Sequence, residues 1–363
     1  MSTTQLGAPS RGAAWLFLLA LVCGAQADVR FTITDIGVLP GADYSVAQGL
    51  ASNGFVAGDG GASGFFWRDG QLTAVGTLGG SWSNALDVNA SGQVVGWAHL
   101  PGNHSLHAFV WQQGAMTDLG TLGGTSSGAR AINDAGQIVG WAELSGALDQ
   151  HACLWQNGQV TDLGTLGGGY SVAYDINAAG RVVGQAARAT GPSHAFLFVD
   201  GVMQDLAPLA DEYSVAFGLN DADQVVGRAW PAGGEPRAFL WDDGVMTDLG
   251  SLDGRYTTAQ AINNGGQVVG YSEVLVQHLP GEPELEFHSF IWESGTLLDL
   301  NDLIAPQSGW RLFEAFGIND GGQIVGMGEI NGAIHGFLLT PVPEPATLAL
   351  LLAIASLLPR GRR

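Results

Sequence analysis

The sequence predicts an all-β fold, a seven-bladed β-propeller of four-stranded blades closed by pairing of the N-terminal strand with the last blade. Three observations predict it: a glycine-rich composition, short motifs that recur seven times, and a repeat phase that splits one blade between the two ends of the chain. Among 363 residues, 56 are glycine and only 13% are charged. This composition suits short strands joined by tight turns better than helices.

Three motifs recur at a spacing of about 40 residues, which is typical of propeller blades. The first resembles Gly-Gln-Val-Val-Gly and ends at Gly58, Gly96, Gly140, Gly184, Gly227, Gly270 and Gly326. The second, His-Ala-Phe-x-Trp in its fullest form, has its last position at Trp67, Trp111, Trp155, Phe198, Trp241, Trp292 and Leu339. The third, Thr-Asp-Leu-Gly-Thr-Leu-Gly-Gly, is complete at 117–124 and 161–168 and looser at 34–41, 73–80, 204–211, 247–254 and 298–305. Seven copies predict seven blades.

Each repeat is interpreted as four short strands rather than as helices. In one copy we expect strands at 129–133, 137–142, 151–155 and 159–166. The last two are joined through an Asn-Gly pair, a strong hairpin signal because both residues tolerate a positive φ. An asparagine recurs in the turn after the first strand, where its side chain can bond to the backbone. It occupies Asn133, Asn177, Asn220, Asn263 and Asn319.

The phase of the repeats predicts a closed ring. Residues 30–39 match the fourth strand of a repeat, whereas the last copy stops after its third strand at 336–339. Each end therefore supplies what the other lacks. Pairing of the first strand with the last three would cover both open edges and complete seven blades.

The N-terminal segment has the features of a secretory signal. A start with a single basic residue precedes an apolar run at 13–22, and Ala25 and Ala27 form an A-x-A cleavage site. We therefore expect signal peptidase to remove residues 1–27 and to release a propeller domain at 28–340.

The C-terminal segment, 341–363, combines three features in order. Pro343, Glu344 and Pro345 precede an apolar stretch at 346–358, and the chain ends in a cluster of arginines. At about 1.5 Å per residue the stretch spans about 20 Å, less than the roughly 30 Å of a hydrocarbon core. This tail resembles the PEP-CTERM sorting signal of Gram-negative bacteria. The resemblance implies a transient inner-membrane anchor, an exosortase-type sorting enzyme as partner, and delivery to the outer surface or extracellular matrix; the alternative is an ordinary C-terminal anchor.

The second motif resembles that of the extracellular HAF-repeat family, named for His-Ala-Phe. The motif is intact at 107–109 and 194–196, and the similarity runs from about residue 30 to residue 340. The other copies depart from it at Ser63, Cys153, Arg237, Ser289 and Gly336. The resemblance implies an exported, surface-associated protein without an assigned reaction.

Charge and cysteine content narrow the possible partners. The 13 basic residues are all arginine against 34 acidic residues, so the surface should repel nucleic acid and anionic lipid. Cys23 lies in the leader, where a lipoprotein signal is the competing interpretation, although Val22 stands at a position that requires a small residue. Cys153 replaces an aromatic residue of the sister repeats, which favours a small buried side chain over a reactive thiol.

Repeated histidines and aspartates do not predict a catalytic or metal site. A metal needs convergent ligands, and a glycosidase needs two carboxyl groups at one place, whereas these residues are spread over different blades. The pattern G-x-S-x-G at 124–128 lacks the helix that follows a nucleophile elbow. We therefore expect structural roles, no cofactor and no enzymatic activity. The residues are His107, His151, His194, His288 and His335, with Asp35, Asp118, Asp162, Asp205, Asp248 and Asp299.

An aromatic residue recurs in the loop from the fourth strand of one repeat to the first of the next. Because the first strand of a propeller blade is innermost, we expect these side chains at one mouth of the channel, beside the variable loops between second and third strands. Amphipathic rings suit the flat apolar faces of sugars, so we predict binding of extracellular polysaccharide or another surface partner. The aromatic residues are Tyr44, Trp82, Tyr170, Tyr213, Tyr256 and Trp310, with Asp43, Asp211, Glu212 and Asp253 nearby.

Two alternatives remain open. In one, the rings wedge between the blades of a structural surface component that has no specific ligand. In the other, the protein is a propeller enzyme that acts on glycans. Exposed rings with polar neighbours would favour a binding protein, fully buried rings a structural component, and converging titratable groups an enzyme.

Overall fold

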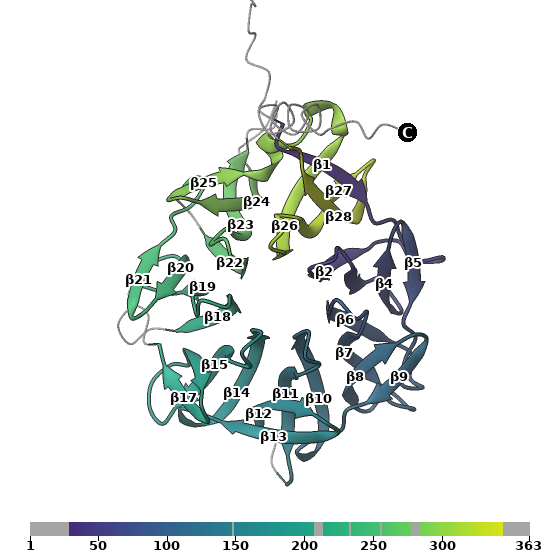
Figure 1. Ribbon diagram of the computed structural model, residues 1–363, viewed down its shortest axis with the longest axis vertical. Coiled ribbons are helices and arrows are strands. Elements are labelled where there is room, and N and C mark those ends of the chain that lie inside the picture. Colours follow the sequence, from purple (N-terminus) through teal and green to yellow (C-terminus); the bar gives the residue numbers. More distant parts are fainter. Residues whose placement is uncertain are drawn as a thin grey trace, which may run out of the picture.

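Consecutive strands of each repeat pair with one another, and the repeats surround a central channel (Figure 1). The computed structural model describes residues 29–146, 149–206, 213–231, 234–254, 256–276 and 284–343. These residues form seven antiparallel sheets of four strands, with the first strand of each repeat beside the channel. The predicted all-β, seven-bladed propeller is therefore confirmed.

Blades one to three follow one another in chain order. Blade one contains β2 (Val46–Leu50), β3 (Val56–Asp59), β4 (Gly64–Arg68) and β5 (Gln71–Ala74). Blade two contains β6 (Ser83–Val88), β7 (Val94–His99), β8 (Leu106–Gln112) and β9 (Ala115–Asp118). Blade three contains β10 (Gly123–Ile132), β11 (Ile138–Leu144), β12 (Gln150–Gln156) and β13 (Gln159–Gly164).

Blades four to seven complete the ring. Blade four contains β14 (Gly167–Ile176), β15 (Val182–Arg188), β16 (His194–Val199) and β17 (Val202–Asp205). Blade five contains β18 (Ser214–Leu219), β19 (Val225–Ala229), β20 (Arg237–Asp242) and β21 (Val245–Asp248). Blade six contains β22 (Thr257–Ile262), β23 (Val268–Val276), β24 (Glu284–Glu293) and β25 (Thr296–Asp299), followed by the 3-10 helices η1 (Leu300–Leu303) and η2 (Pro306–Ser308). Blade seven contains β26 (Trp310–Ile318), β27 (Ile324–Ile330), β28 (Ala333–Pro341) and β1 (Phe31–Asp35).

Strand β1 closes the ring as the sequence predicts. It pairs along its whole length with β28, so the purple start of the chain lies beside its yellow end in Figure 1. The residue before β1, Arg30, accepts a backbone hydrogen bond from Val342 at 2.8 Å and forms an ion pair with Glu293 of blade six at 2.6 Å. Phe31 is buried against blades six and seven. The first and last strands of the propeller are thus fixed to one another and to the preceding blade.

Some strand ends differ from the expected ones where the backbone turns. β1 stops at Asp35 instead of residue 39 because Gly37, with a φ of 77°, donates its N–H to the Asp35 carboxylate and bends the chain. β13 stops at Gly164, where φ is 79°, instead of residue 166. β10 begins before residue 129 because Gly123 still pairs with Leu144 beyond an irregularity in the ladder. Bulges and left-handed glycines, which strand periodicity does not reveal, therefore set these limits.

Two of the sequence motifs meet in the core of six of the seven described blades. The last glycine of Gly-Gln-Val-Val-Gly lies opposite the phenylalanine of His-Ala-Phe, as Gly184 lies opposite Phe196. A Cβ atom on Gly184 would overlap with the carbonyl oxygen of Val172 and lie 2.8 Å from the Phe196 ring. Only glycine fits where a ring and a neighbouring strand both approach this closely. The fully buried phenylalanines are Phe65, Phe109, Phe196, Phe239, Phe290 and Phe337.

Blade three carries Cys153 at the phenylalanine position, opposite Gly140. Its thiol is buried and free. Burial raises the pKa of the thiol well above its ordinary value, so the group is neutral and apolar at physiological pH. The small buried side chain that the sequence predicts is the one observed.

The predicted processing segments lie almost entirely outside the described residues. Ala25 and Ala27 of the signal site are not described, nor are Glu344 and Pro345 of the sorting motif, so these predictions stay untested. Pro343 follows the end of β28. Over the described part of the chain, no helix is long and apolar enough to cross a membrane.

We expect Gly184→Ala to lower the free energy of unfolding by about 3 kcal/mol, because the added methyl group has no space between Val172 and Phe196. Urea denaturation followed by intrinsic fluorescence measures the change. Gly169→Ala in the same blade is the control, since its Cβ would meet only the Asp149 side chain, at 3.3 Å. Equal stability of the two variants would contradict this account of the motif.

Candidate functional site

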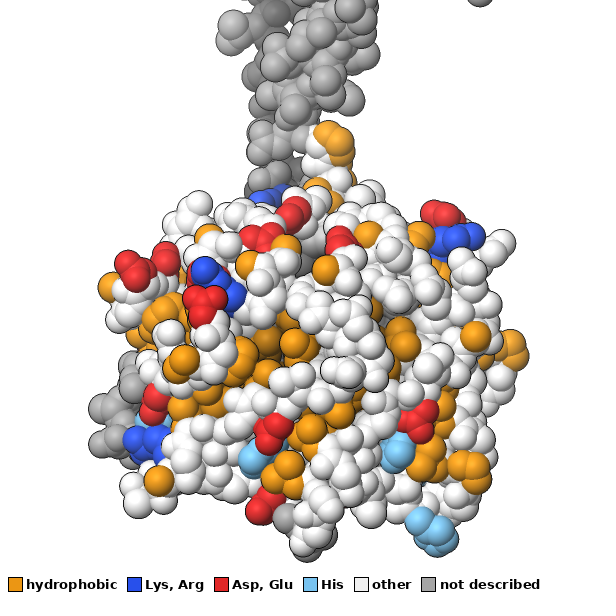
Figure 2. All heavy atoms as spheres, turned by 60° about the horizontal axis from the view of Figure 1, so that its bottom comes forward, with side chains coloured by type: hydrophobic (Ala, Val, Ile, Leu, Met, Phe, Trp, Pro, Cys, Tyr) orange, Lys and Arg blue, Asp and Glu red, His pale blue; other side chains and the backbone are white. Residues whose placement is uncertain are grey.

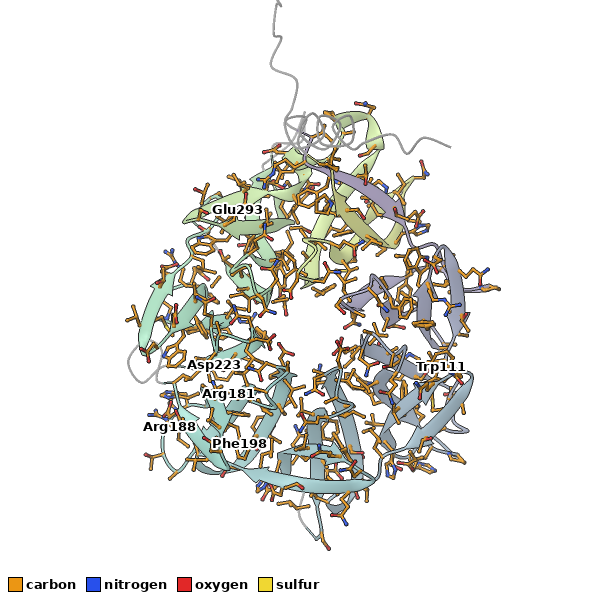
Figure 3. The ribbon with its side chains drawn as sticks, in the orientation of Figure 1. Trp111, Arg181, Arg188, Phe198, Asp223 and Glu293 are labelled. Carbon is orange, nitrogen blue, oxygen red and sulfur yellow. The ribbon has the colours of Figure 1, made fainter. Side chains whose placement is uncertain are left out.

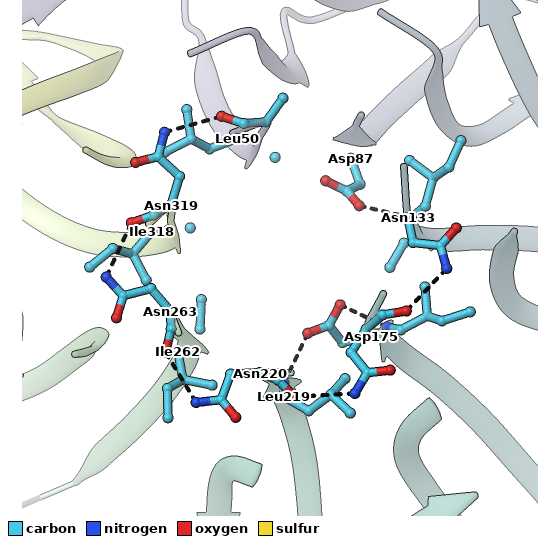
Figure 4. A pocket seen from close by; sticks show the side chains of 18 of the residues that line it. Leu50, Asp87, Asn133, Asp175, Leu219, Asn220, Ile262, Asn263, Ile318 and Asn319 are labelled. Atoms are coloured by element: carbon cyan, nitrogen blue, oxygen red, sulfur yellow. Dashed lines mark hydrogen bonds between the residues drawn. The ribbon is translucent and has the colours of Figure 1, made fainter. Parts of the chain in front are cut away.

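The inner strands enclose a cavity of about 360 Å³ along the central channel (Figure 4). All seven inner strands contribute to its wall, mostly through residues near their C-terminal ends. Equivalent positions on successive blades form layers of side chains around the channel. Because a repeated layer is nearly symmetric, only the differences between blades can distinguish one side of the cavity from another. The distinguishing residues of the wall are Gln48, Asp87, Arg130, Tyr174, Asp175, Phe217, Gln260 and Phe316.

One layer of the wall is a ring of asparagines that joins the blades. The side-chain amide of each asparagine donates to the backbone carbonyl of the equivalent residue in the next blade, over 3.0 to 3.2 Å (Figure 4). Its carboxamide oxygen accepts backbone N–H bonds within the turn, as Asn177 does from Ala179 and Arg181. The predicted role of the asparagines in the turn is confirmed. Their hydrogen bond to the next blade was not predicted from the sequence. The asparagines are Asn89, Asn133, Asn177, Asn220, Asn263 and Asn319.

Two carboxyl groups, those of Asp87 and Asp175, occupy the bulge position of the inner strands of blades two and four. Each accepts one N–H from its own strand and one from the next blade, where the donors are Ile132 at 2.8 Å and Leu219 at 2.9 Å. Burial raises the pKa of Asp87 to about 7 and that of Asp175 to about 6, although these hydrogen bonds act in the opposite direction. The other five blades have glycine or alanine at this position, so the two acids break the symmetry of the channel.

The repeated histidines and aspartates form pairs at the outer part of the blades. In five blades the histidine Nδ1 lies 2.6 to 3.0 Å from the carboxylate of the third motif. The same carboxylate accepts a backbone N–H two residues further on, as in Asp118 and Gly120. One pair, His335 with Asp35, joins the two ends of the chain. Figure 2 shows histidine side chains next to acidic ones on this face. The pairs are separate from one another, in keeping with a structural role.

The other chemical motifs of the sequence are also part of the framework. The segment 124–128 lies within the continuous strand β10, and Ser127 is buried. Its hydroxyl accepts the N–H of Ala108 in blade two at 2.9 Å and donates to the carbonyl of Gly120 at 2.7 Å. The described residues contain no group of three or more His, Cys, Asp or Glu side chains placed to hold a metal ion.

The sequence motifs do not predict this serine as an inter-blade contact. A buried serine follows the aromatic loop position in several repeats and bonds to the third strand of the preceding blade. The sequence feature that could have indicated this contact is a serine at the same position of five repeats, directly before the apolar part of the first strand. The residues are Ser45, Ser83, Ser127, Ser171 and Ser214.

The six predicted aromatic residues lie at the opposite end of the inner strands from the cavity, and none of them lines it. Two of them pack against rings of their own blade: Trp82 against His99 at 5.7 Å and Trp310 against Phe337 at 6.3 Å. Trp310 also packs against the apolar cluster that blades six and seven share, so the wedge interpretation fits this ring. Tyr44 is 37% exposed and lines a separate hollow of about 310 Å³ formed by the β1–β2 and β3–β4 loops.

The other three, Tyr170, Tyr213 and Tyr256, lie on consecutive blades and share partners. The amide of Gln185 donates to the Tyr170 hydroxyl at 2.8 Å and accepts a hydrogen bond from the Tyr213 hydroxyl. The guanidinium of Arg228 lies 5.2 Å from the Tyr256 ring centre. The three tyrosines and Arg228 are partly exposed, whereas Gln185 is buried and bonds to two of the tyrosines. We name this group, Tyr170, Gln185, Tyr213, Arg228 and Tyr256, the tyrosine platform.

Sequence reasoning missed the second-strand residues that complete the platform. Gln185 and Arg228 directly follow the last glycine of the Gly-Gln-Val-Val-Gly motif. That position differs in every blade except for a repeated tryptophan, and it holds Asp59, Trp97, Trp141, Gln185, Arg228, Tyr271 and Met327. A variable residue directly after a constant motif is the sequence feature that could have indicated these platform residues.

Comparisons with known proteins find one family of unknown function and several solved structures of low similarity. A family described as "Protein of unknown function (DUF3466)" matches residues 167–333, less than half of the chain. No curated protein matches. Similar solved structures include the β-propeller domain of the trilobed protease from Pyrococcus furiosus, with 10% identity, a TM-score of 0.49, and coverage of 82% of this chain and 94% of that one.

Two further structures are similar over most of this chain. TolB from Acinetobacter baumannii has 11% identity and a TM-score of 0.44, with 82% of this chain and 63% of that chain covered. Trypanosoma rangeli sialidase has 10% identity and a TM-score of 0.37, with 90% of this chain and 61% of that chain covered. The chain therefore spans less than two thirds of the length of either protein. At this identity the similarities concern the propeller fold, and they carry no argument about function.

We expect the bond between Asn177 and blade five to be a measurable part of ring stability. Asn177→Ala removes it together with the turn bonds and should lower the free energy of unfolding by about 2 to 4 kcal/mol. Asn177→Asp keeps the acceptor oxygen for the turn but places a second acceptor against the Asn220 carbonyl and the Asp223 carboxylate, so it removes both contacts with blade five and keeps the turn bonds. Denaturant unfolding of both variants measures the two contributions. Wild-type stability of Asn177→Asp would contradict a role for the ring.

We expect stability to decline with rising pH because of the two channel acids. Their raised pKa values, about 7 for Asp87 and about 6 for Asp175, mean that the folded protein holds these protons more tightly than the unfolded chain. That stabilisation is complete below about pH 4 and is lost as the pH rises through the folded pKa values. Urea unfolding between about pH 5 and pH 8 measures the slope. Asp87→Asn should flatten it, whereas Asp69→Asn at an exposed turn should not; an unchanged slope in Asp87→Asn would count against the raised pKa.

Proposed function

We propose that this protein is an exported surface protein that binds polysaccharide through the tyrosine platform. The observation that supports the proposal is the arrangement of Tyr170, Tyr213 and Tyr256, three equivalent loop residues on consecutive blades held by Gln185 and Arg228. Partly exposed rings of this kind combine an apolar face with polar edges. A row across three blades suits an extended ligand better than a compact one.

The polar groups of the platform are suited to sugar hydroxyls. The three phenol groups and the Gln185 carboxamide can each donate or accept a hydrogen bond. Tyr256 also stacks on Tyr271, with ring centres 6.1 Å apart, and meets Phe287 edge-on at 5.8 Å. Phe287 is 37% exposed, which extends the apolar surface outward along the β23–β24 hairpin. Alternating apolar rings and hydrogen-bonding groups are what the two faces of a pyranose chain require.

We further propose that the protein is not an enzyme. The His–Asp pairs are separate and bonded to backbone, and the two channel acids each accept two backbone N–H groups, so neither set presents free groups to one reacting atom. The structural component without a ligand is the competing candidate, and the packed rings of Trp82 and Trp310 favour it at those two positions.

Export and sorting remain part of the proposal. The secretory signal ending at Ala27 and the PEP-CTERM-like tail with Pro343, Glu344 and Pro345 support delivery to the outer surface or the extracellular matrix. A strongly acidic surface, with acidic side chains scattered over the face in Figure 2, suits a protein that stays soluble among other surface components.

Replacing Tyr170, Tyr213 and Tyr256 together by alanine should reduce polysaccharide affinity by about 100-fold, if each ring contributes about 1 kcal/mol. Residues 28–340 are first screened on an array of neutral and acidic polysaccharides, and affinity for the strongest ligand is then measured by calorimetry. Trp82→Ala is the control, because it removes an equivalent ring outside the platform. Unchanged affinity of the folded triple variant, or no binding by the wild type to any polysaccharide, would reject the proposal.

A further inference from the structure

At least five of the eight arginines in the described part of this acidic chain form ion pairs with carboxylates. Arg181 of blade four, for example, pairs with Asp223 of blade five (Figure 3). With 34 acidic residues available for 13 arginines, such pairing is the expected outcome. The other ion pairs are Arg30 with Glu293, Arg68 with Asp69, Arg237 with Asp248, and Arg311 with Glu286 and Glu329.

Arg130 and Arg228 have no carboxylate partner among the described residues and lie against aromatic rings instead. The guanidinium carbon of Arg130 is 4.7 Å from the Trp97 ring centre and 5.2 Å from that of Tyr174. That of Arg228 is 4.4 Å from the ring centre of Trp230. Arg130 belongs to the wall of the channel cavity, and Arg228 belongs to the tyrosine platform.

The two arginines are connected through a pair of rings. Tyr174, which contacts Arg130, meets Phe217 edge-on at 5.3 Å, and Phe217 lies 5.7 Å from the Arg228 guanidinium. Both rings line the cavity. The sequence Arg130, Tyr174, Phe217, Arg228 therefore connects the channel cavity to the platform across blades three to five.

Each of these arginines has a buried donor that no described residue satisfies. The Nε atoms of Arg130 and Arg228 are enclosed and lack a hydrogen-bond partner. Arg228 makes one bond through Nη1 to the Thr258 hydroxyl, at 3.3 Å. An unsatisfied donor of a charged group costs more free energy than a neutral one, so a matching acceptor would be bound favourably. Burial also lowers the pKa of Arg130, which a nearby anion would reverse.

The guanidinium groups of Arg130 and Arg228 are planar, so a planar hydrogen-bond acceptor fits them best. The Nε atom of each guanidinium is enclosed, so a ligand meets the terminal Nη groups, whose N–H donors match the two oxygens of a carboxylate. The carboxyls of Asp87 and Asp175 line the same cavity, but they accept backbone amides and form no ion pair with Arg130 among the described residues. Both guanidinium groups are thus without a carboxylate from the described residues.

We propose that the platform recognises a sugar acid, with the carboxylate of a uronic acid unit bound by Arg130 or Arg228 and its ring stacked on the neighbouring tyrosines. This inference rests on the proposed function and specifies its ligand class. The acidic surface repels polyanions in general, so attraction is confined to the place where two unpaired guanidinium groups are found. Specificity for the carboxylate thus comes from local hydrogen bonds and not from net charge.

The test compares two ligands that differ only in charge: an oligogalacturonate and its full methyl ester. We expect the wild-type protein to bind the acid at least about tenfold more tightly than the ester, the effect of one charge-assisted bond. In Arg130→Gln and Arg228→Gln the preference for the acid should be lost, because affinity for the acid falls by more than affinity for the ester. Arg68→Gln, which removes an exposed charge, is the matched control. Tryptophan fluorescence is a second readout, because Trp97 and Trp230 contact the two arginines.

Each outcome decides between the two proposals. Equal binding of acid and ester by the wild type overturns the carboxylate inference and leaves the platform proposal standing, whereas binding of neither ligand counts against both. A preference that survives both arginine substitutions, or that disappears in Arg68→Gln, also overturns the inference. If a glutamine variant fails to fold, Arg130→Lys keeps the charge but not the planar fork, and it should weaken the preference. Monomeric galacturonate binding as tightly as the oligomer would support the inference and identify a free sugar acid as the ligand.

Discussion

Pairing of β1 with β28 is the constraint on which the rest of the molecule depends. The apolar clusters combine residues of neighbouring blades, so each blade needs a neighbour on both sides. In one cluster, Phe31 of β1 packs with Ile291 of blade six and Leu312 of blade seven. An open array would leave a strand edge and two apolar faces in water, each with a large free-energy cost. Closure removes all of them at once.

The inner and outer radii of the ring are stabilised by different chemistry. Around the channel, asparagine amides satisfy the carbonyl groups of the next blade, so polar backbone that faces a narrow space keeps its hydrogen bonds. Further out, glycine and phenylalanine fill the middle of each blade, and His–Asp pairs fix the start of the third strand to the end of the fourth. Because these devices repeat, they build a framework that is nearly symmetric and chemically uniform.

Specific chemistry arises where the repeats differ. Asp87 and Asp175 appear on two blades of seven. No other blade has an arginine at the position of Arg130 or at that of Arg228. The platform lies on one sector of the ring, with Gln185 joining tyrosines of two blades. A rigid symmetric framework with a few individual residues is an economical way to position a binding surface, since the framework fixes the backbone and the variable positions supply the contacts.

The sequence by itself determined the number of blades, their strand order and the closure, because repeat spacing and phase follow directly from the periodicity of a blade. It also placed Tyr170, Tyr213 and Tyr256 on matching loops. It did not pair His107 with Asp118 or relate Gln185 to two tyrosines. Nor did it show that Arg130 and Arg228 form no ion pair with a carboxylate of the described residues and stack on aromatic rings instead. Those contacts join residues from different strands or blades, and side-chain packing across an interface has no period along the chain. Only the tertiary structure decided which repeated residues serve the framework and which are free to bind.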